Sequence, residues 1–216
     1  MDRLPFYQRP LRATYYNVTL ILIGINAAVF LFGELVSPRL VYEYLVMNPI
    51  YVTQANRWWQ VLTYMFAHAS IWHLFFNMLG LFFFGVQLER RLGSSEFLLF
   101  YLLSGTLAGL FSLLVYWFTG AFTVFLLGAS GAVFAVLLAY ATYYPTSRIL
   151  LFGIVPIRAP VLVVGYAAIE VFNMFSRNRG NVAHLTHLAG FAFAYLYLIV
   201  RLRINPIREF MDSRRY

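Results

Sequence analysis

A serine between two glycines begins a long apolar stretch of the chain. Residues 128–144 read GASGAVFAVLLAYATYY, with no charged side chain among them. A serine hydroxyl becomes a nucleophile when a neighbouring base accepts its proton. The chain offers four such bases, His68, His73, His184 and His187. The combination points to acyl transfer by an activated serine, provided that the fold brings Ser130 and a histidine together.

Helical rise predicts which polar residues share one depth in a membrane. Ser130 and His187 each lie fourteen residues from the inner end of their apolar segments, about 21 Å at ~1.5 Å per residue. Asn77 lies twelve residues, about 18 Å, from the inner end of its segment, and His73 adds one more turn. All four therefore fall in one layer, about 5–10 Å below the outer edge of an apolar core ~30 Å thick.

Small residues predict that two of these helices touch. They recur at four-residue spacing as Gly131, Ala135 and Ala139 in the fourth apolar segment, and as Gly190 and Ala194 in the sixth. Such faces let membrane helices approach closely. Because Ser130 and His187 lie beside the first small residue of each face, a crossing there would bring the hydroxyl to the imidazole.

Two further polar residues could stabilise a developing negative charge. His73 and Asn77 are spaced i, i+4, so they share one face of their helix. With the backbone N–H of Ser130 they could donate to an oxyanion, while Gly128 and Gly131 let a loop turn and a helix pack around the serine. Each feature alone has a simpler explanation, since a serine in a membrane helix usually bonds back to its own helix. The joint pattern favours catalysis.

The overall composition is that of a membrane protein. Hydrophobic residues make up 62% of the 216 residues and charged residues 11%, and long apolar runs recur along the chain. The net charge of +8 does not indicate a nucleic-acid partner, because all sixteen basic residues are arginines near the ends of apolar segments. The absence of cysteine excludes disulfides and cysteine-ligated metals.

We therefore expect an all-α, polytopic membrane protein with six transmembrane helices. The predicted spans are 17–34, 70–88, 95–116, 129–144, 159–175 and 184–200. An even number puts both termini on one side, and a cytoplasmic assignment places twelve arginines inside and four outside. The predicted organisation is a cytoplasmic N-terminal arm (1–16) before a retained signal-anchor helix, a six-helix membrane core (17–203), and a cytoplasmic basic tail (204–216).

The predicted connections differ in kind. Residues 35–69 form a long first outer loop, whose tryptophans and tyrosines suit the membrane interface. Residues 89–96 form a tight inner turn, in which Gly93 ends one helix and Ser94 is a candidate N-cap for the next. Residues 117–128 are apolar but too short and glycine-broken to span. The chain shows no internal repeat, which disfavours a transporter.

The motifs around the polar layer resemble those of the rhomboid family of intramembrane serine proteases. The matching stretches are HASIWHLFFN (68–77), ERRLG (89–93), GASG (128–131) and AHLTHLAGF (183–191). The resemblance covers most of residues 15–200, in the family's order and with its six spans. It implies a six-helix rhomboid-like bundle and a Ser-His dyad without an acidic member, with no cofactor and no metal.

The resemblance also implies a role for each matching residue. Ser130 would be the nucleophile and His187 the general base, with His184 as a neighbour of the base. The remaining implied roles are oxyanion stabilisation for His73, Asn77, Gly128 and the Ser130 amide, a place near the water-access region for His68, and a structural role for Glu89.

Two positions depart from the family's pattern. Gln60 follows Trp59 where members often have an arginine, although Arg57 is nearby. Phe134 stands one turn after the serine, where many members have a tyrosine beneath the base. A phenylalanine can stack there but cannot donate a hydrogen bond.

We expect the protein to hydrolyse peptide bonds within or beside transmembrane segments of substrate proteins in the bilayer. The last outer loop (176–183) would act as a lid, and the fifth helix would form a lateral gate through Tyr166, Phe172 and Phe175. In that helix Glu170 and Asn173 are expected to bond a neighbouring helix. The expected location is a bacterial cytoplasmic membrane, and the substrate and oligomeric state stay open.

Three other functions compete with this one. A zinc site could use His184 and His187, spaced i, i+3, but there is no H-E-x-x-H motif and no inward carboxylate is expected near them at matching depth. A non-catalytic rhomboid-like protein could bind transmembrane helices, although inactive relatives generally lack the serine or the histidine. A transporter is the third.

Overall fold

Six apolar helical segments form the body of the molecule in the computed structural model, which describes residues 5–9, 11, 14–151, 153–175 and 181–213. They are α1 (Val18–Leu35), a segment made of α5 (Ile71–Gly80), η3 (Leu81–Gly85) and α6 (Val86–Leu92), α7 (Ser94–Thr119), α8 (Ser130–Tyr143), α9 (Ala159–Phe175) and α10 (Asn181–Val200). Each begins and ends within four residues of a predicted span. The predicted six-helix membrane bundle is confirmed.

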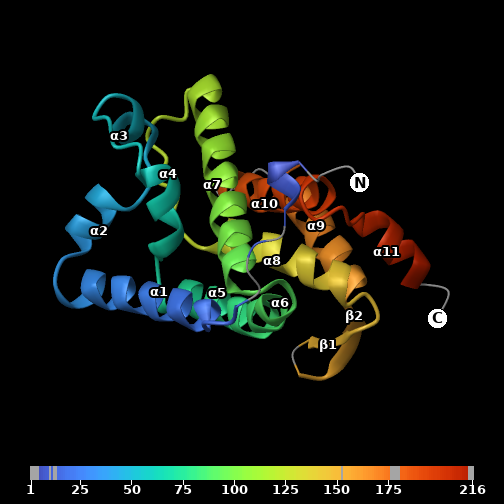
Figure 1. Cartoon of the computed structure of the whole chain (residues 1–216). Coiled ribbons are helices and arrows are strands. Elements are labelled where there is room, and N and C mark those ends of the chain that lie inside the picture. The colour runs from blue at the N-terminus through green and yellow to red at the C-terminus, as the bar shows by residue number, and fades with distance from the viewer. Residues whose placement is uncertain (1–4, 10, 12–13, 152, 176–180, 214–216) are drawn as a thin grey trace.

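The long helix α7 divides the bundle. Figure 1 shows α1 on one side of it, with the short helices of the first loop, and α8, α9 and α10 on the other. The segments Val18–Leu35, Ile71–Leu92 and Ser94–Thr119 are long and apolar enough to cross a membrane by themselves, whereas α8 is shorter. Because α8 has only 14 residues, its first residue lies within the bundle rather than at its outer edge.

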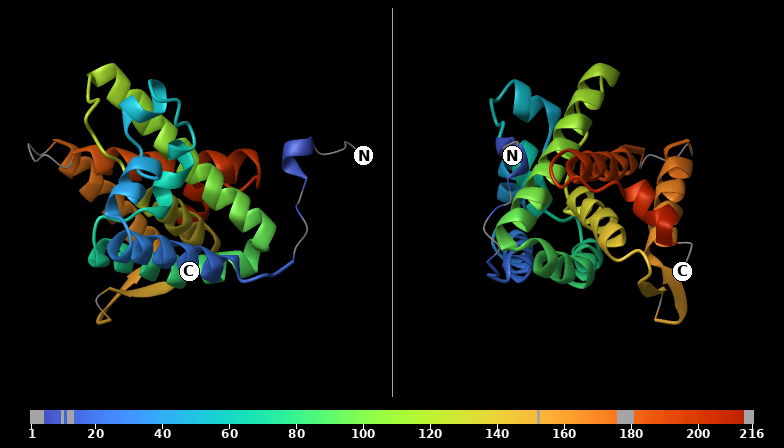
Figure 2. Two further views of the ribbon diagram at one scale, coloured as in Figure 1. Left: turned by 90° about the vertical axis from the view of Figure 1, so that its left-hand side faces the viewer. Right: turned by 45° about the vertical axis from the view of Figure 1, so that its right-hand side comes forward.

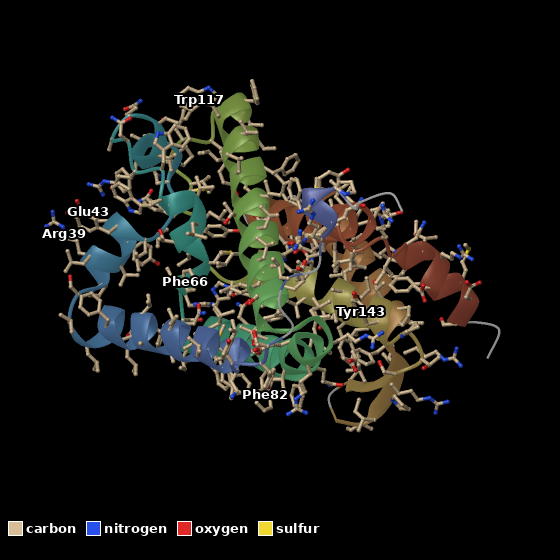
Figure 3. The ribbon with its side chains drawn as sticks, viewed as in Figure 1. Arg39, Glu43, Phe66, Phe82, Trp117 and Tyr143 are labelled. Carbon is tan, nitrogen blue, oxygen red and sulfur yellow. The ribbon has the colours of Figure 1, made fainter. Side chains whose placement is uncertain are left out.

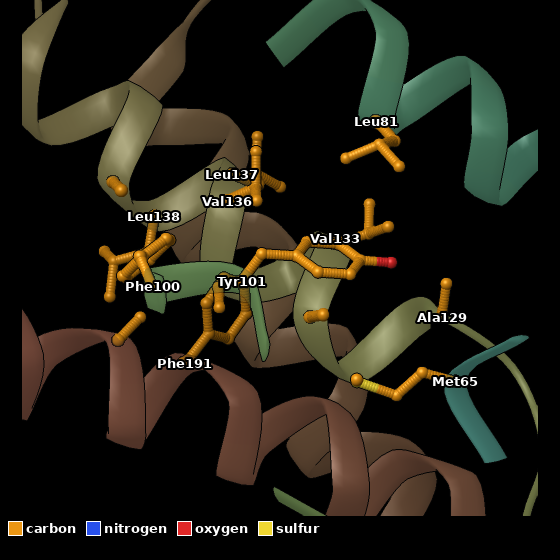
Figure 4. Packing of buried hydrophobic residues seen from close by; sticks show 14 of the residues in the cluster. Met65, Leu81, Phe100, Tyr101, Ala129, Val133, Val136, Leu137, Leu138 and Phe191 are labelled. Carbon is orange, nitrogen blue, oxygen red and sulfur yellow. The ribbon is translucent and has the colours of Figure 1, made fainter. Parts of the chain in front are cut away.

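Helix α8 is almost entirely enclosed. Eleven of its 14 residues are buried, and Figure 4 shows Phe100 and Tyr101 of α7 packed near Val133, Val136 and Leu138 of α8. The exceptions are Ser130, Phe134 and Tyr143, which are partly exposed. Ser130 and Phe134 are one turn apart, so they lie on the same face of α8.

The predicted first outer loop folds into short helices, α2 (Pro38–Tyr44), α3 (Pro49–Thr53), α4 (Gln60–Thr63) and η2 (Tyr64–Phe66). Two of them begin at a polar residue followed by proline, a strong start signal. The Ser37 side chain accepts a hydrogen bond from the N–H of Leu40, and that of Asn48 accepts from Ile50 and Tyr51. The chain also has η1 (Phe6–Gln8) and α11 (Pro206–Asp212) near its ends.

One element departs from the expected all-α fold. Strands β1 (Arg148–Leu151) and β2 (Val155–Arg158) form an antiparallel hairpin in which Ile149 pairs with Ile157. It extends beyond the end of α9 (Figure 2). β-Branched residues favour strands, and Gly153 adopts φ +73° at the turn. The helical expectation for the whole chain is corrected at this hairpin.

A buried carboxylate joins α6 to the first turn of α1. Glu89 is 0% exposed and accepts hydrogen bonds from the N–H groups of Val18 and Thr19 at 2.7 and 2.8 Å. It also accepts from the hydroxyls of Thr19 (2.7 Å) and Ser94 (2.5 Å). A negative charge at a helix N-terminus satisfies orphan N–H groups. Asn17, the residue before α1, makes no side-chain cap. Glu89 therefore takes this role and caps α1 from another helix.

The inner turn differs in one detail from its prediction. Gly93 ends α6 with φ +84°, as expected. Ser94, however, is the first residue of α7 rather than its N-cap. Its hydroxyl donates to Glu89 and accepts from the N–H of Tyr16 at 2.7 Å. The Ser94 hydroxyl therefore links α6 to the residues before α1 instead of capping α7.

We predict that Glu89→Ala lowers the free energy of unfolding by at least about 3 kcal/mol, because it removes four hydrogen bonds to a buried charge, and a single bond of this kind contributes roughly 1.5–3 kcal/mol. Glu89→Gln should cost less, since it keeps one acceptor oxygen. The thermal unfolding midpoint in detergent measures both. Glu34→Ala on the exposed side of α1 is the control, and an equal effect there would contradict the capping role.

Candidate active site

Ser130 and His187 meet where α8 and α10 cross. The Ser130 hydroxyl oxygen lies 2.7 Å from Nε2 of His187. The crossing is close because both helices carry glycine there, and a Cβ added to Gly190 would lie within 2.9 Å of the Gly131 carbonyl carbon. Ala135 and Ala194 continue the two faces and are 0% exposed. The predicted crossing of small-residue faces is found at the predicted place.

Phe134 fixes the plane of the imidazole. Its ring stacks on His187 with centroids 4.5 Å apart and an interplanar angle of 9°. Tyr166 and Phe191 pack edge-on against Phe134 at 5.7 and 5.1 Å. The phenylalanine therefore provides the stacking that its position implies, without a hydroxyl.

The other imidazole nitrogen of His187 faces a carboxylate. Nδ1 of His187 is 3.0 Å from Oε1 of Glu170 on α9, and Nδ1 of His184 is 2.5 Å from Oε2. Glu170 thus bonds a neighbouring helix, as expected. The expectation that no inward carboxylate lies near these histidines is wrong. Glu170 lies eleven residues from the inner end of α9 at Ala159, about 16 Å, so helical rise puts it within roughly one turn of the depth of His187.

The donor types of this cluster also raise the question of a metal ion. The donor atoms of Glu170, His184 and His187 lie within 4.8 Å of one another, the one such group among the described residues. Zinc holds nitrogen and oxygen ligands at ~2.0–2.1 Å, which places tetrahedral ligands about 3.3 Å apart. The 2.5 and 3.0 Å separations here are hydrogen-bond distances. As placed, the three side chains share hydrogen bonds rather than surround an ion.

His73 and Asn77 line the same cavity as Ser130 and His187, a space of about 480 Å³. The His73 ring lies against the backbone of Gly128, where φ is +118° and an added Cβ would fall 2.6 Å from the ring. Nδ1 of His73 accepts from the N–H of Ala69 at 3.5 Å, which leaves Nε2 to carry the proton. One amide hydrogen of Asn77 goes to the His73 carbonyl at 2.8 Å, and the second is free to donate.

His68 supports the residue before the serine. Its Nε2 accepts a hydrogen bond from the N–H of Ala129 at 3.4 Å, and its ring lies 5.0 Å from that of His73. Burial, and then the charge of His73, lower the pKa of His68 from 6.5 to about 4. His68 is therefore neutral at neutral pH, as an acceptor must be.

Gln60 and Arg57 share the task of anchoring the first loop. Gln60 is 0% exposed, and its amide donates to the Glu43 carbonyl at 2.9 Å. Arg57 donates to the same carbonyl and pairs with the Glu43 carboxylate at 3.0 Å. Glu43 lies on α2, beside Arg39 (Figure 3). Gln60 therefore bonds α2 through the Glu43 carbonyl, and Arg57, three residues earlier in the chain, bonds the same carbonyl.

Several predicted residues can be placed only in part. Of the expected lid, residues 176–180 lie outside the described residues. Of the expected gate, Tyr166 lines the cavity and Phe172 is 74% exposed, whereas the side chain of Phe175 lies outside the described part. The role of Asn173 stays a prediction.

The six apolar helices define an integral membrane protein. The hydrogen-bonded serine and histidine form a polar centre between these helices. Residues 55–204 match the family model of the Rhomboid domain. Because this match covers more than half of the chain, the chain belongs to the rhomboid family. Rhomboid-family proteins act on transmembrane substrates in the bilayer, as intramembrane proteases or in rhomboid-like roles.

Individual relatives show how far the similarity extends. Rhomboid protein 1, mitochondrial, of Saccharomyces cerevisiae is 33% identical over 187 residues, 84% of this chain and 52% of that protein. YdcA of Bacillus subtilis is 28% identical over 187 residues, 86% of this chain and 90% of that protein. Rhomboid protease GluP of Bacillus subtilis is 39% identical over 82 residues, 38% of this chain and 15% of that protein. The chain spans about half the length of the yeast protein.

We predict that Gly190→Ala destabilises the bundle, although alanine favours a helix more than glycine does. The added methyl group meets backbone of α8, which cannot swing aside like a flexible side chain. Overpacking of this kind costs about 1–3 kcal/mol, measured as a lower thermal midpoint in detergent. Gly165→Ala on α9 is the matched control, because its Cβ has nothing within 4 Å. Equal midpoints for the two variants would contradict the close crossing.

We also predict that acid destabilises the protein through His68. Its pKa falls from 6.5 to about 4 on folding, so between these values the unfolded chain binds the additional proton and stability rises with pH. The contribution, about 3 kcal/mol, is complete above pH ~6.5 and is lost as the pH falls toward 4. Unfolding midpoints between pH 7 and 4 should decline less steeply in His68→Asn than in the native protein. Parallel declines would contradict the prediction.

Proposed function

We propose that the protein is an intramembrane serine endopeptidase that cleaves peptide bonds in or near transmembrane segments. The observation that carries the proposal is the 2.7 Å contact between the Ser130 hydroxyl and Nε2 of His187. It lies in a largely apolar cavity between membrane helices. A serine paired with a neutral imidazole is an activated nucleophile.

The proposed reaction begins with proton transfer. His187 accepts the Ser130 proton as the hydroxyl oxygen attacks the scissile carbonyl. The N–H of Ser130, at the start of α8, and the side chains of His73 and Asn77 donate to the resulting oxyanion. His187 then returns the proton to the leaving amine, and a water molecule, activated by the same imidazole, hydrolyses the acyl-enzyme.

The substrate segment is proposed to enter between α5 and α9. The cavity is bounded there by apolar side chains of both helices, including Phe76, Leu162 and Tyr166. Leu150 of the hairpin lines the same cavity. An apolar wall of this kind fits a transmembrane helix arriving from lipid, with its polar backbone exposed only near the serine.

The proposed setting is a bacterial cytoplasmic membrane, with the N-terminal arm (1–16) and the basic tail (204–216) on the cytoplasmic side of a core at 17–203. The arginine distribution supports this orientation, since twelve of sixteen arginines would face the cytoplasm.

Labelling with a fluorophosphonate serine probe in detergent tests the proposal. We expect labelling of the native protein, none of Ser130→Ala, and a rate at least about 100-fold lower for His187→Ala, because general-base assistance is worth 10²–10⁴-fold. Ser147→Ala, at the inner end of the bundle, is the control and should label like the native protein. Cleavage of a transmembrane substrate in proteoliposomes should follow the same order.

A folded native protein that resists the probe and leaves transmembrane substrates intact would contradict the proposal. The helix-binding rhomboid-like function would then be favoured. Equal thermal midpoints for the native protein and Ser130→Ala establish that the absence of labelling reports chemistry rather than unfolding.

A further inference from the structure

We propose that Glu170 is a positioning residue for His187, so that the site works as a Ser130–His187–Glu170 triad rather than as a dyad. This inference rests on the proposed function. Its basis is the 3.0 Å contact between Oε1 of Glu170 and Nδ1 of His187, on the side of the ring opposite Ser130.

The geometry sets the tautomer of the base. An ionised carboxylate only accepts hydrogen bonds, so Glu170 requires the proton of a neutral His187 to be on Nδ1. The lone pair of Nε2 then points to the Ser130 hydroxyl, which is the arrangement that a general base needs. When His187 takes up the serine proton, the imidazolium lies against a negative charge that stabilises it.

The carboxylate is itself held in place. The Glu170 side chain is 8% exposed, and its second oxygen is 2.5 Å from Nδ1 of His184. His184 and His187 lie one turn apart on α10, so both imidazoles approach the carboxylate from the same helix. Phe134 stacks on the face of the His187 ring. With its plane stacked and both nitrogens bonded, the ring has little freedom to rotate.

The burial of Glu170 argues for a role beyond helix packing. A buried carboxylate is costly unless it is paired and hydrogen-bonded. An arginine carries a permanent positive charge, whereas a histidine does not, so two histidines pair the carboxylate less completely than an arginine would. By contrast, the buried Glu96 is matched by Arg201 with contacts of 2.5 and 2.7 Å. The fold thus places an incompletely neutralised acid beside the one imidazole that gains a positive charge in the proposed reaction.

The test uses Glu170→Gln, Glu170→Ala and Glu170→Asp in the full chain. We expect Glu170→Gln and Glu170→Ala to lower the second-order rate constant of fluorophosphonate labelling 10- to 1,000-fold at unchanged Ser130. Glu170→Asp should recover part of the rate, because it restores the charge. The thermal midpoint of each variant shows whether the fold is kept. Native-like rates in the folded Gln and Ala variants would overturn the proposal while leaving Ser130 and His187 intact.

The imidazole ¹⁵N shifts of His187 provide a readout that does not depend on labelling. At neutral pH we expect the proton on Nδ1 in the native protein, and a mixture of tautomers in Glu170→Gln. A native His187 with its proton on Nε2, or populations that Glu170→Gln leaves unchanged, would overturn the positioning role even if no probe reacts.

A bound metal ion would also be detected. We expect labelling to be insensitive to a chelator. Stoichiometric divalent metal in the purified protein, together with chelator-sensitive labelling that Zn²⁺ restores, would overturn the proposal, because Glu170 and the histidines would then be holding an ion.

Discussion

The site depends on one backbone contact, the approach of Gly190 on α10 to Gly131 on α8. In lipid, helices gain little from hiding apolar surface, so close packing and interhelical hydrogen bonds hold them together. The absence of a side chain at Gly190 lets the backbones meet, because a Cβ there would collide with the backbone of Gly131. Ser130 precedes one glycine, and His187 lies three residues before the other. The hydrogen bond between them, the stacking of Phe134 and the reach of Glu170 all require that spacing.

Three buried acids show how the bundle accommodates charge, and each joins a different pair of elements. Glu89 receives backbone and hydroxyl hydrogen bonds and caps α1 from α6. Glu96 on α7 pairs with Arg201, just after α10. Glu170 links α9 to α10 through two imidazoles. The first two are strongly satisfied junctions at the inner end of the bundle. The third is held by two histidines rather than by backbone donors or an arginine, and of the three it alone lies beside the serine.

The helices and the meeting of Ser130 with His187 were predictable from the sequence, because span length, helical rise and small-residue spacing are properties of single helices and their depths. Glu170 could have been included by the same count from the start of its helix. The side of the helix on which Glu170 lies could not be predicted, because a nearly uniformly apolar helix does not indicate which of its faces packs against a neighbour. The hairpin was missed because a short apolar run with one glycine is compatible with strand or helix. Ser94 was misassigned because its hydroxyl bonds Glu89 and the N–H of Tyr16, and the second of these is a tertiary contact.

The link between Glu170 and His187 has a consequence for how the bundle can open. Glu170 belongs to α9, which also supplies Leu162 and Tyr166 to the wall of the cavity. An outward tilt of α9 that lengthens the 3.0 Å contact by roughly 0.5 Å or more takes it past hydrogen-bonding distance. His187 then loses its contact with Glu170 while α9 is displaced from the cavity. Under the proposed function, the site would be inactive while α9 is tilted outward and active only when α9 packs against the bound segment, which would limit unselective cleavage of membrane proteins.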